Sequence, residues 1–279
     1  MAANTLHDPT TSLGGFLRDR RARLRPGADA GRRRTPGLRR EEVAARAGVS
    51  VTWYTWLEQG RGGPPSDGVL ERLVNALELD AAAREMLFLL ARPRRAPAGP
   101  TARPRVPPAI QNVLDAMPTS PAMVKTPTWD IVAWNAAASG LFIDDGALQA
   151  HEYNSLRRLF CDPAARTSLP DWEENARFAL AVFRIDVARA GGSPEAAALI
   201  AELEAKSADF RRLWAENEVR SHGVGLKRFH DPVVGQFALE VSAFAVEGAE
   251  GLTMMVFTPA SAADARAMEV LLARRARAA

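Results

Sequence analysis

The residues with the clearest capacity for chemistry are the arginines near the N-terminus. Ten arginines fall between Arg18 and Arg40, where the only acidic residues are Asp19 and Asp29. A guanidinium group stays charged at every physiological pH and matches phosphate oxygens in a fork geometry. This concentration of arginine predicts a polyanion partner for the N-terminal region, with a solvated basic arm that binds nothing as the alternative.

The excess positive charge is confined to this part of the chain. Residues 1–100 contain 17 arginines, no lysine and 11 acidic residues, whereas residues 101–279 contain 19 basic and 22 acidic residues. The formal net charge of +3 therefore joins a basic segment to a mildly acidic one. We expect the two segments to have different tasks.

A catalytic or metal site would need histidine, cysteine or carboxylate side chains at suitable spacing. His222, His230, Asp231 and Cys161 come nearest, but they are not spaced as metal ligands are. Because Cys161 is the only cysteine, an intramolecular disulfide and a cysteine-based zinc cluster are excluded. The chain has no phosphate-binding glycine loop and no Gly-x-Ser-x-Gly motif. We expect no enzymatic activity, no cofactor and no bound metal.

The hydropathy pattern indicates no membrane segment. No apolar run approaches the roughly 20 residues that a bilayer span requires. The first thirty residues lack the apolar core of a secretory signal. We therefore expect a cytoplasmic protein without a membrane partner.

The chain divides at residues 92–108, which contain six prolines and no apolar periodicity. Proline removes backbone donors and disfavours helix in the residue before it, so this segment is predicted to be a semi-extended linker. The expected organisation is a disordered N-terminus (1–11), a helical domain (12–91), the linker, and a second domain (109–279).

Apolar periodicity predicts five short helices before the linker, and the second and third have the features of a helix-turn-helix. These two helices cover Arg39–Ala47 and Ser50–Gly60. Such a pair needs a small residue where the helices touch and a flexible residue at the turn. Ala44 supplies the contact, and Gly48 supplies a turn at which positive φ costs little. The residues expected to face the core are Val43, Ala47, Val49, Tyr54 and Leu57.

The outer face of the second helix of this pair is expected to enter a major groove. Thr52 and Gln59 can form hydrogen bonds with bases, and Val51 can pack on a thymine methyl group. Basic residues beside the helix pair are placed for phosphate contacts. The expected DNA-binding residues are Arg39, Arg40, Ser50, Val51, Thr52, Thr55, Trp56, Gln59 and Arg61.

Three points about this helix pair stay open. Trp53 either packs against the first helix or lies on the surface. Glu58 is acidic on a DNA-facing helix, so we expect it to form an internal hydrogen bond or salt bridge. A helical hairpin without any DNA function remains the general alternative.

After the linker the pattern is mixed. Strands are expected at Ala122–Val124, Ile131–Trp134, Leu226–Phe229, Phe237–Val246 and Leu252–Phe257, with helices that begin at Asp171, Ser193-Pro194 and Ser207. Strands at both ends with helices between them predict an α+β domain in which an antiparallel sheet is covered by helices.

Several motifs together resemble a known family. Residues 12–91, with TPGLRREEVA and AGVSVTWYTWLEQGR, resemble the XRE (Cro/repressor-type) helix-turn-helix. PAMVKTPTWDIVAWN, LRRLFCDPAAR, DWEENAR and FRRLWAENEV are similar to MmyB-like transcription regulators. The resemblance covers nearly the whole chain and implies a five-helix lambda-repressor-like DNA-binding domain followed by a PAS-like ligand domain. It also implies long-chain acyl ligands such as fatty acids, and operator binding as a homodimer.

The chain departs from the family at two motifs. Where the family commonly has Trp-x-x-His, this chain has Trp214 followed three residues later by Asn217. The usual His-Pro-x-x-Gly is replaced by a motif that begins at Asp231, with His230 one place earlier. These changes leave the identity of the ligand open.

A PAS-like pocket would lie between the sheet and the helices. An aliphatic tail gains roughly 0.8 kcal/mol per buried CH₂, whereas a buried carboxylate needs a cation or a donor. Candidates for that head group are Asn135, Arg157, Arg184 and His222. The expected ligand-binding residues are Trp129, Trp134, Asn135, Phe142, Arg157, Phe160, Trp172, Phe183, Arg184, Phe210 and Trp214.

The function expected from the sequence is therefore a DNA-binding transcription regulator that responds to an apolar small-molecule effector. Two other classes remain as alternatives. One is a protein-interaction or antitoxin-like module, and the other is a ligand-processing enzyme with a tethered DNA domain.

Overall fold

The computed structural model describes residues 12–26, 36–61, 63–92, 105–142, 153–223, 225–249 and 251–277. The chain divides into a helical unit, residues 1–95 with 215–220, and a sheet unit, residues 96–214 with 221–279. The expected disordered N-terminus and most of the arginine-rich loop 28–37 lie outside the described residues. So does most of the expected linker 92–108.

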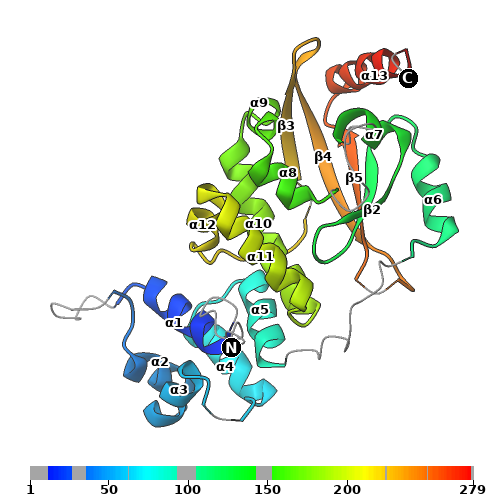
Figure 1. Ribbon diagram of the computed structural model, residues 1–279. Coiled ribbons are helices and arrows are strands. Elements are labelled where there is room, and N and C mark those ends of the chain that lie inside the picture. Colours follow the sequence, from blue (N-terminus) through cyan, green and yellow to red (C-terminus); the bar gives the residue numbers. More distant parts are fainter. Residues whose placement is uncertain are drawn as a thin grey trace. The chain divides into compact units, whose positions relative to one another are not determined.

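The described part of the helical unit contains five helices, as expected (Figure 1). The helices are α1 (Leu13–Arg23), α2 (Arg40–Ala47), α3 (Val51–Glu58), α4 (Asp67–Ala76) and α5 (Ala81–Ala91). Three of these helices, α1, α3 and α5, have a side-chain cap at the N-terminus. The side chains of Ser12, Ser50 and Asp80 accept hydrogen bonds from the backbone N–H groups of Gly15, Trp53 and Ala83 respectively.

Glycine permits a close approach between α1 and α3. A Cβ atom on Gly14 would lie 2.3 Å from the backbone oxygen of Glu58, so only glycine fits at this crossing. Leu17, Val43 and Tyr54 are fully buried nearby and form the core of the helical unit. The end of α3 is therefore held directly against the start of α1.

The described residues of the sheet unit form an antiparallel five-stranded sheet in the order β2-β1-β5-β4-β3. This is the antiparallel sheet with helices expected for a PAS-like domain. The strands are β1 (Ala122–Lys125), β2 (Ile131–Trp134), β3 (Gly225–Asp231), β4 (Gly235–Ala245) and β5 (Thr253–Pro259).

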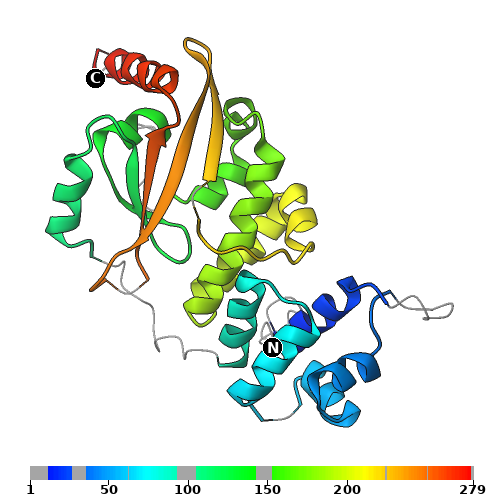
Figure 2. The same ribbon diagram turned by 180° about the vertical axis from the view of Figure 1, so that it is seen from behind.

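Helices cover both faces of the sheet. Leu114 of α6 packs on one face with Val124 and Val256, whereas Ala138 of α7 and Met268 of α13 pack on the other. Helices α8 to α12 gather on the β3 side, and α6 lies beyond β2 (Figures 1 and 2). The helices are α6 (Pro108–Asp115), α7 (Ala136–Phe142), α8 (Ser155–Cys161), α9 (Ala164–Ser168), α10 (Trp172–Arg189), α11 (Pro194–Lys206), α12 (Ala208–Trp214) and α13 (Ala262–Ala276).

The apolar spacing after Ser207 also predicts that Asn217 lies on one face of the helix that begins there. This is wrong, because α12 ends at Trp214 and Asn217 has a φ of 54°. Asparagine tolerates this left-handed conformation, which ends helical pairing. Asp171 occupies the N-cap position of α10, as expected, but its carboxylate accepts from Arg228 and forms no capping hydrogen bond.

None of the described helices combines the length and the apolar character that crossing a bilayer requires.

Gly14→Ala is expected to lower the free energy of unfolding of the helical unit by about 1–3 kcal/mol, because the added methyl group meets backbone that cannot move aside. Gly68→Ala in α4 is the matched control. A Cβ there meets nothing closer than 3.8 Å, and alanine in a helix gains about 0.5–1 kcal/mol over glycine. Chemical denaturation measures both, and equal effects of the two changes would contradict the close approach.

Candidate functional site

The turn between α2 and α3 has the geometry of a helix-turn-helix. Gly48 ends α2 with φ 62° and ψ 41°, and the N–H of Val49 donates to the carbonyl of Ala44 at 3.0 Å. Arg72 of α4 donates to the carbonyl of Ala47 at 2.8 Å and satisfies the end of α2. Backbone geometry and a bond from a third helix therefore fix the angle between α2 and α3.

One face of α3 is exposed and the opposite face is core. Tyr54 and Leu57 are buried, whereas Val51 is 39% exposed and Trp56 is 50% exposed. Trp53, whose position was left open, is half-buried. Of the other residues expected to bind DNA, Ser50, Thr52, Gln59 and Arg61 are exposed and Thr55 is half-buried. Large exposed apolar side chains on a single helix face are typical of an interaction surface.

Glu58 at the end of α3 is buried and forms two ion pairs. Its carboxylate accepts from Arg21 of α1 at 2.6 Å and from Arg40 of α2 at 2.7 Å. Arg21 also donates to the carbonyl of Leu38 at 2.8 Å. Burial and the neighbouring Glu58 raise the pKa of Tyr54, which stays a neutral phenol. The internal salt bridge expected for Glu58 is therefore present, and it joins three helices.

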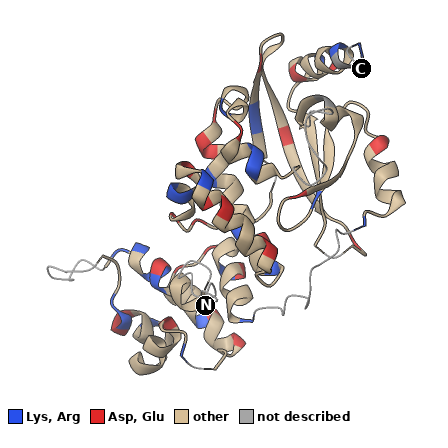
Figure 3. Cartoon of the chain, in the orientation of Figure 1, with Lys and Arg blue, Asp and Glu red and all other residues tan. Residues whose placement is uncertain are grey.

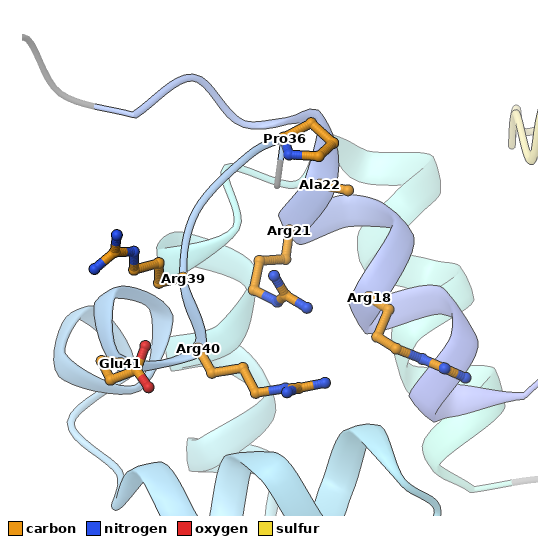
Figure 4. Close-up of a pocket in the computed structure, with 7 residues that line it drawn as sticks. All are labelled: Arg18, Arg21, Ala22, Pro36, Arg39, Arg40 and Glu41. Carbon is orange, nitrogen blue, oxygen red and sulfur yellow. The ribbon is translucent and has the colours of Figure 1, made fainter. Parts of the chain in front are cut away.

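A basic hollow of about 560 Å³ lies where α1 approaches the start of α2 (Figure 4). Arg21 and Arg40 on its wall are committed to Glu58, so they shape the hollow rather than offer free charge. Arg39 points away from them in Figure 4 and forms no side-chain bond within the described part of the chain. The lining residues are Arg18, Arg21, Ala22, Pro36, Arg39, Arg40 and Glu41.

Sequence reasoning singled out Arg39 and Arg40 but not Arg18 and Arg21. The signal was available, because residues three apart share one face of a helix. What could not be foreseen is that Arg40 is bonded to Glu58 whereas its neighbour Arg39 is not.

The residues expected to bind a ligand fall into two separate clusters of the sheet unit. The rings of Phe160 and Phe210 lie 5.2 Å apart, and those of Phe183 and Trp214 lie 6.0 Å apart, in a cluster built on α8, α10 and α12. Trp134 instead packs on the sheet with Phe142 nearby. The helical cluster contains Trp129, Phe160, Trp172, Phe183, Phe210 and Trp214.

The expected head-group residues are engaged with other parts of the sheet unit. Asn135 donates to the carbonyls of Leu114, Met117 and Ser120 and accepts from two N–H groups. Hydrogen bonds from Arg157 and then Lys206 lower the pKa of Glu202 to about 2. Arg184 lies 3.7 Å from the centre of the Trp214 ring and donates to the Trp214 carbonyl.

Sequence reasoning missed a polar cluster around Asp186 in α10. The carboxylate of this buried residue accepts from Lys125 of β1 and from the indole N–H of Trp129, each at 2.8 Å. The carboxylate also lies 2.9 Å from Nε2 of His222. His222, the fourth head-group candidate, is therefore engaged as well. Burial would raise the pKa of Asp186, but the bond from His222 and the charge of Lys125 lower it to about 2. Burial lowers the pKa of Lys125 to about 8, against the attraction of Asp186.

No three or more His, Cys, Asp or Glu side chains among the described residues gather as they would around a metal ion. Cys161 is exposed and forms no disulfide. Partial desolvation of its thiol still raises the pKa of Cys161, which disfavours the reactive thiolate.

Comparison with known proteins gives two matches. A family model described as a helix-turn-helix domain matches residues 12–87. A second, described as the MmyB-like transcription regulator ligand binding domain, matches residues 106–271. A search of curated proteins found no match to this chain.

The two neighbouring arginines are expected to behave differently on substitution. Arg40→Ala removes one of two ion pairs to a buried carboxylate and should lower the free energy of unfolding by about 1–2 kcal/mol, after allowance for the partial exposure of Arg40. Arg39→Ala should change it by less than about 0.5 kcal/mol, because this side chain is exposed and forms no hydrogen bond or ion pair with a described residue. Urea denaturation of the full chain measures both, and equal losses would contradict the assignment of Arg40 to Glu58.

Proposed function

The chain belongs to the family of MmyB-like transcription regulators, and we propose that it binds operator DNA through α3 and responds to an apolar, fatty-acid-like effector in its sheet unit. A helix-turn-helix joined to such a ligand-binding domain makes it a ligand-responsive DNA-binding regulator. The proposal adds the groove-facing residues, a homodimeric state and the class of effector.

The observation that carries the DNA half of the proposal is the exposed face of α3. Val51 and Trp56 are large apolar side chains held in solvent, and Thr52 and Gln59 stand exposed on the same helix. A rigid helix of this kind fits a major groove, where threonine and glutamine can bond to base edges and valine can contact a thymine methyl group.

Phosphate contacts would come from the basic residues of the helical unit around this helix, where Lys and Arg are blue in Figure 3. Arg39, with no partner among the described residues, and the exposed Arg61 are the best placed. The side chain of Arg40 is 41% exposed but forms an ion pair with the buried Glu58, so only part of its charge is available to a phosphate group. Phosphate contacts set the register of the protein on the duplex, whereas the α3 residues select the sequence.

We propose that the chain binds DNA as a homodimer, which fits the spacing of the major grooves. Two copies of α3 would occupy successive major grooves, about 34 Å apart along one face of the duplex. In a dimer each copy reads one half-site, so the complex reads twice as many base pairs as a single copy, and each copy makes the same contacts. We propose that the effector changes the relative population of dimer arrangements that fit this spacing.

The effector half of the proposal is supported by the large apolar interior of the sheet unit. Its helical cluster gathers six of the expected aromatic residues. An aliphatic chain inserted among such side chains would gain roughly 0.8 kcal/mol per buried CH₂. We propose retention of this ligand without its conversion, in a protein that acts in the cytoplasm.

DNA binding is tested with duplexes selected from a random library. Arg39→Ala should weaken binding to all duplexes and lower the slope of log affinity against log salt by about 1. Thr52→Ala and Gln59→Ala should each cost about 1–3 kcal/mol for selected duplexes only. Arg84→Ala, an exposed arginine on α5, is the control and should bind as the parent does. If no duplex is enriched, or if all variants bind alike, the DNA half of the proposal fails.

The effector half is tested by native mass spectrometry of the purified chain. We expect co-purifying apolar molecules, and a shift in DNA affinity when they are removed and dodecanoate is added. A protein with no retained apolar molecule, and with DNA affinity unaffected by C12 amphiphiles, would contradict it. Steady conversion of the added compound would instead favour an enzyme.

A further inference from the structure

Strand β3 carries a half-buried lysine, Lys227, on the face of the sheet that packs against the apolar core. Lys227 pairs with Leu239 of β4, between the pairs Phe229–Phe237 and Gly225–Val241. Side chains alternate between the faces of a sheet, and directly opposed residues share a face. Phe229, Phe237, Leu239 and Val241 are all buried in one apolar cluster, so Lys227 occupies their face.

The neighbouring Leu226 shows that the usual arrangement, with apolar residues inside and charged residues outside, is reversed in this part of β3. Leu226 is 52% exposed on the outer face, whereas the half-buried Lys227 lies on the inner face. The pattern of β4 dictates it, because Phe237, Leu239 and Val241 alternate with more exposed residues and can face the core in only one register. Lysine is almost never buried unless it is paired.

Lys227 has no such pair. None of the described residues forms an ion pair or a hydrogen bond with it, and burial alone lowers the pKa of Lys227 to about 8. The side chain is therefore still mainly protonated at neutral pH. A partly buried ammonium group without a counter-charge is costly, because it has lost part of its hydration and forms no ion pair in return.

A second lysine shares this face. Lys125 pairs with Thr253 of β5, which pairs with Ala245 of β4, a residue on the same side as Val241. The positive charge of Lys227 lowers the pKa of Lys125, in the same direction as burial does, so the two lysines repel each other. Asp186 neutralises Lys125 but also accepts from Trp129 and contacts His222, so it has little capacity left for Lys227.

The inner face of the sheet therefore carries two lysines, and among the described residues only the carboxylate of Asp186 is bonded to either of them, through Lys125. We propose that Lys227 is the anion-binding residue of the effector site, where its ammonium pairs with a carboxylate or phosphate group on the effector. The apolar body of the effector then lies along the buried sheet residues beside it, with Leu239 and Phe229 as the first contacts. This inference rests on the proposed effector-binding function and names the chemistry of the effector head group.

The test uses the full chain stripped of bound small molecules and titrated by calorimetry at neutral pH. The probes are dodecanoate, dodecyl phosphate and dodecanol, which share a tail and differ in the head group. Lys227→Met keeps the length of the side chain and removes its charge. Lys206→Met is the matched control, because Lys206 is an exposed lysine of the same unit that pairs with Glu202 at the surface.

The parent chain should bind one of the two anionic probes at least about tenfold more tightly than dodecanol. Which anion it prefers separates carboxylate from phosphate. Lys227→Met should abolish that preference and leave dodecanol binding unchanged, while Lys206→Met should bind as the parent does. Equal binding of dodecanol and both anions by the parent, or a preference that survives Lys227→Met, would overturn the inference while leaving an apolar effector intact.

Thermal unfolding of the ligand-free chain gives an independent readout. Lys227→Met should raise the melting temperature or leave it unchanged, since it removes an unpaired charge from the interior. A fall in melting temperature, with the anion preference retained, would show a structural role and overturn the inference. Acetate and inorganic phosphate complete the test. If they stabilise the parent but not Lys227→Met, and no C12 probe binds, the anion site stands and the apolar effector fails; if no anion has any effect, the anion site fails.

Discussion

The helical unit depends on one buried carboxylate, that of Glu58. It ends α3, yet its two partners come from α1 and α2, so a single charged group fixes the positions of all three helices. A buried carboxylate is tolerable only with close counter-charges, and two guanidinium groups provide them. The contact of Gly14 with the end of α3 adds a steric constraint at the same place. The exposed face of α3 is therefore presented by a rigid support, as a recognition surface requires.

The sheet unit is organised around a comparable group, Asp186. Its carboxylate collects donors from β1, from the β1–β2 turn and from the segment before β3, and so connects the sheet to α10. The two carboxylates differ in their surroundings. The partners of Glu58 are partly open to solvent, whereas Lys125 beside Asp186 is fully enclosed and shares its surroundings with a second cation. The first arrangement serves stability, and the second leaves the charge of Lys227 without a partner among the described residues, which is the basis of the anion site proposed above.

Much of the fold could be predicted from the sequence because its signals are local. Apolar spacing, the caps at Ser50 and Asp80 and the turn at Gly48 determined five helices in the right places. The strands were also located, with every expected end within two residues of the observed one. The partners of polar residues could not be predicted, since Arg40 and Arg39 look alike until α3 is placed beside one of them. Lys227 was missed for the same reason, because β3 alone favours Leu226 as the core residue and only its pairing with β4 reverses that choice.

The reversed polarity of β3 makes the short connection between β3 and β4 more important than its place at the surface suggests. Sliding β3 by one residue would turn Leu226 inward and release Lys227 to water, but it would also turn the buried Phe229 outward and Arg228 inward. Asp231 opposes it by accepting from the N–H groups of Val233 and Val234, and Gly235 closes the loop with a φ of 76°. The hydrogen bonds of this surface turn thus help to hold Lys227 on the inner face of the sheet, and changes in the turn can alter the proposed effector site without touching it.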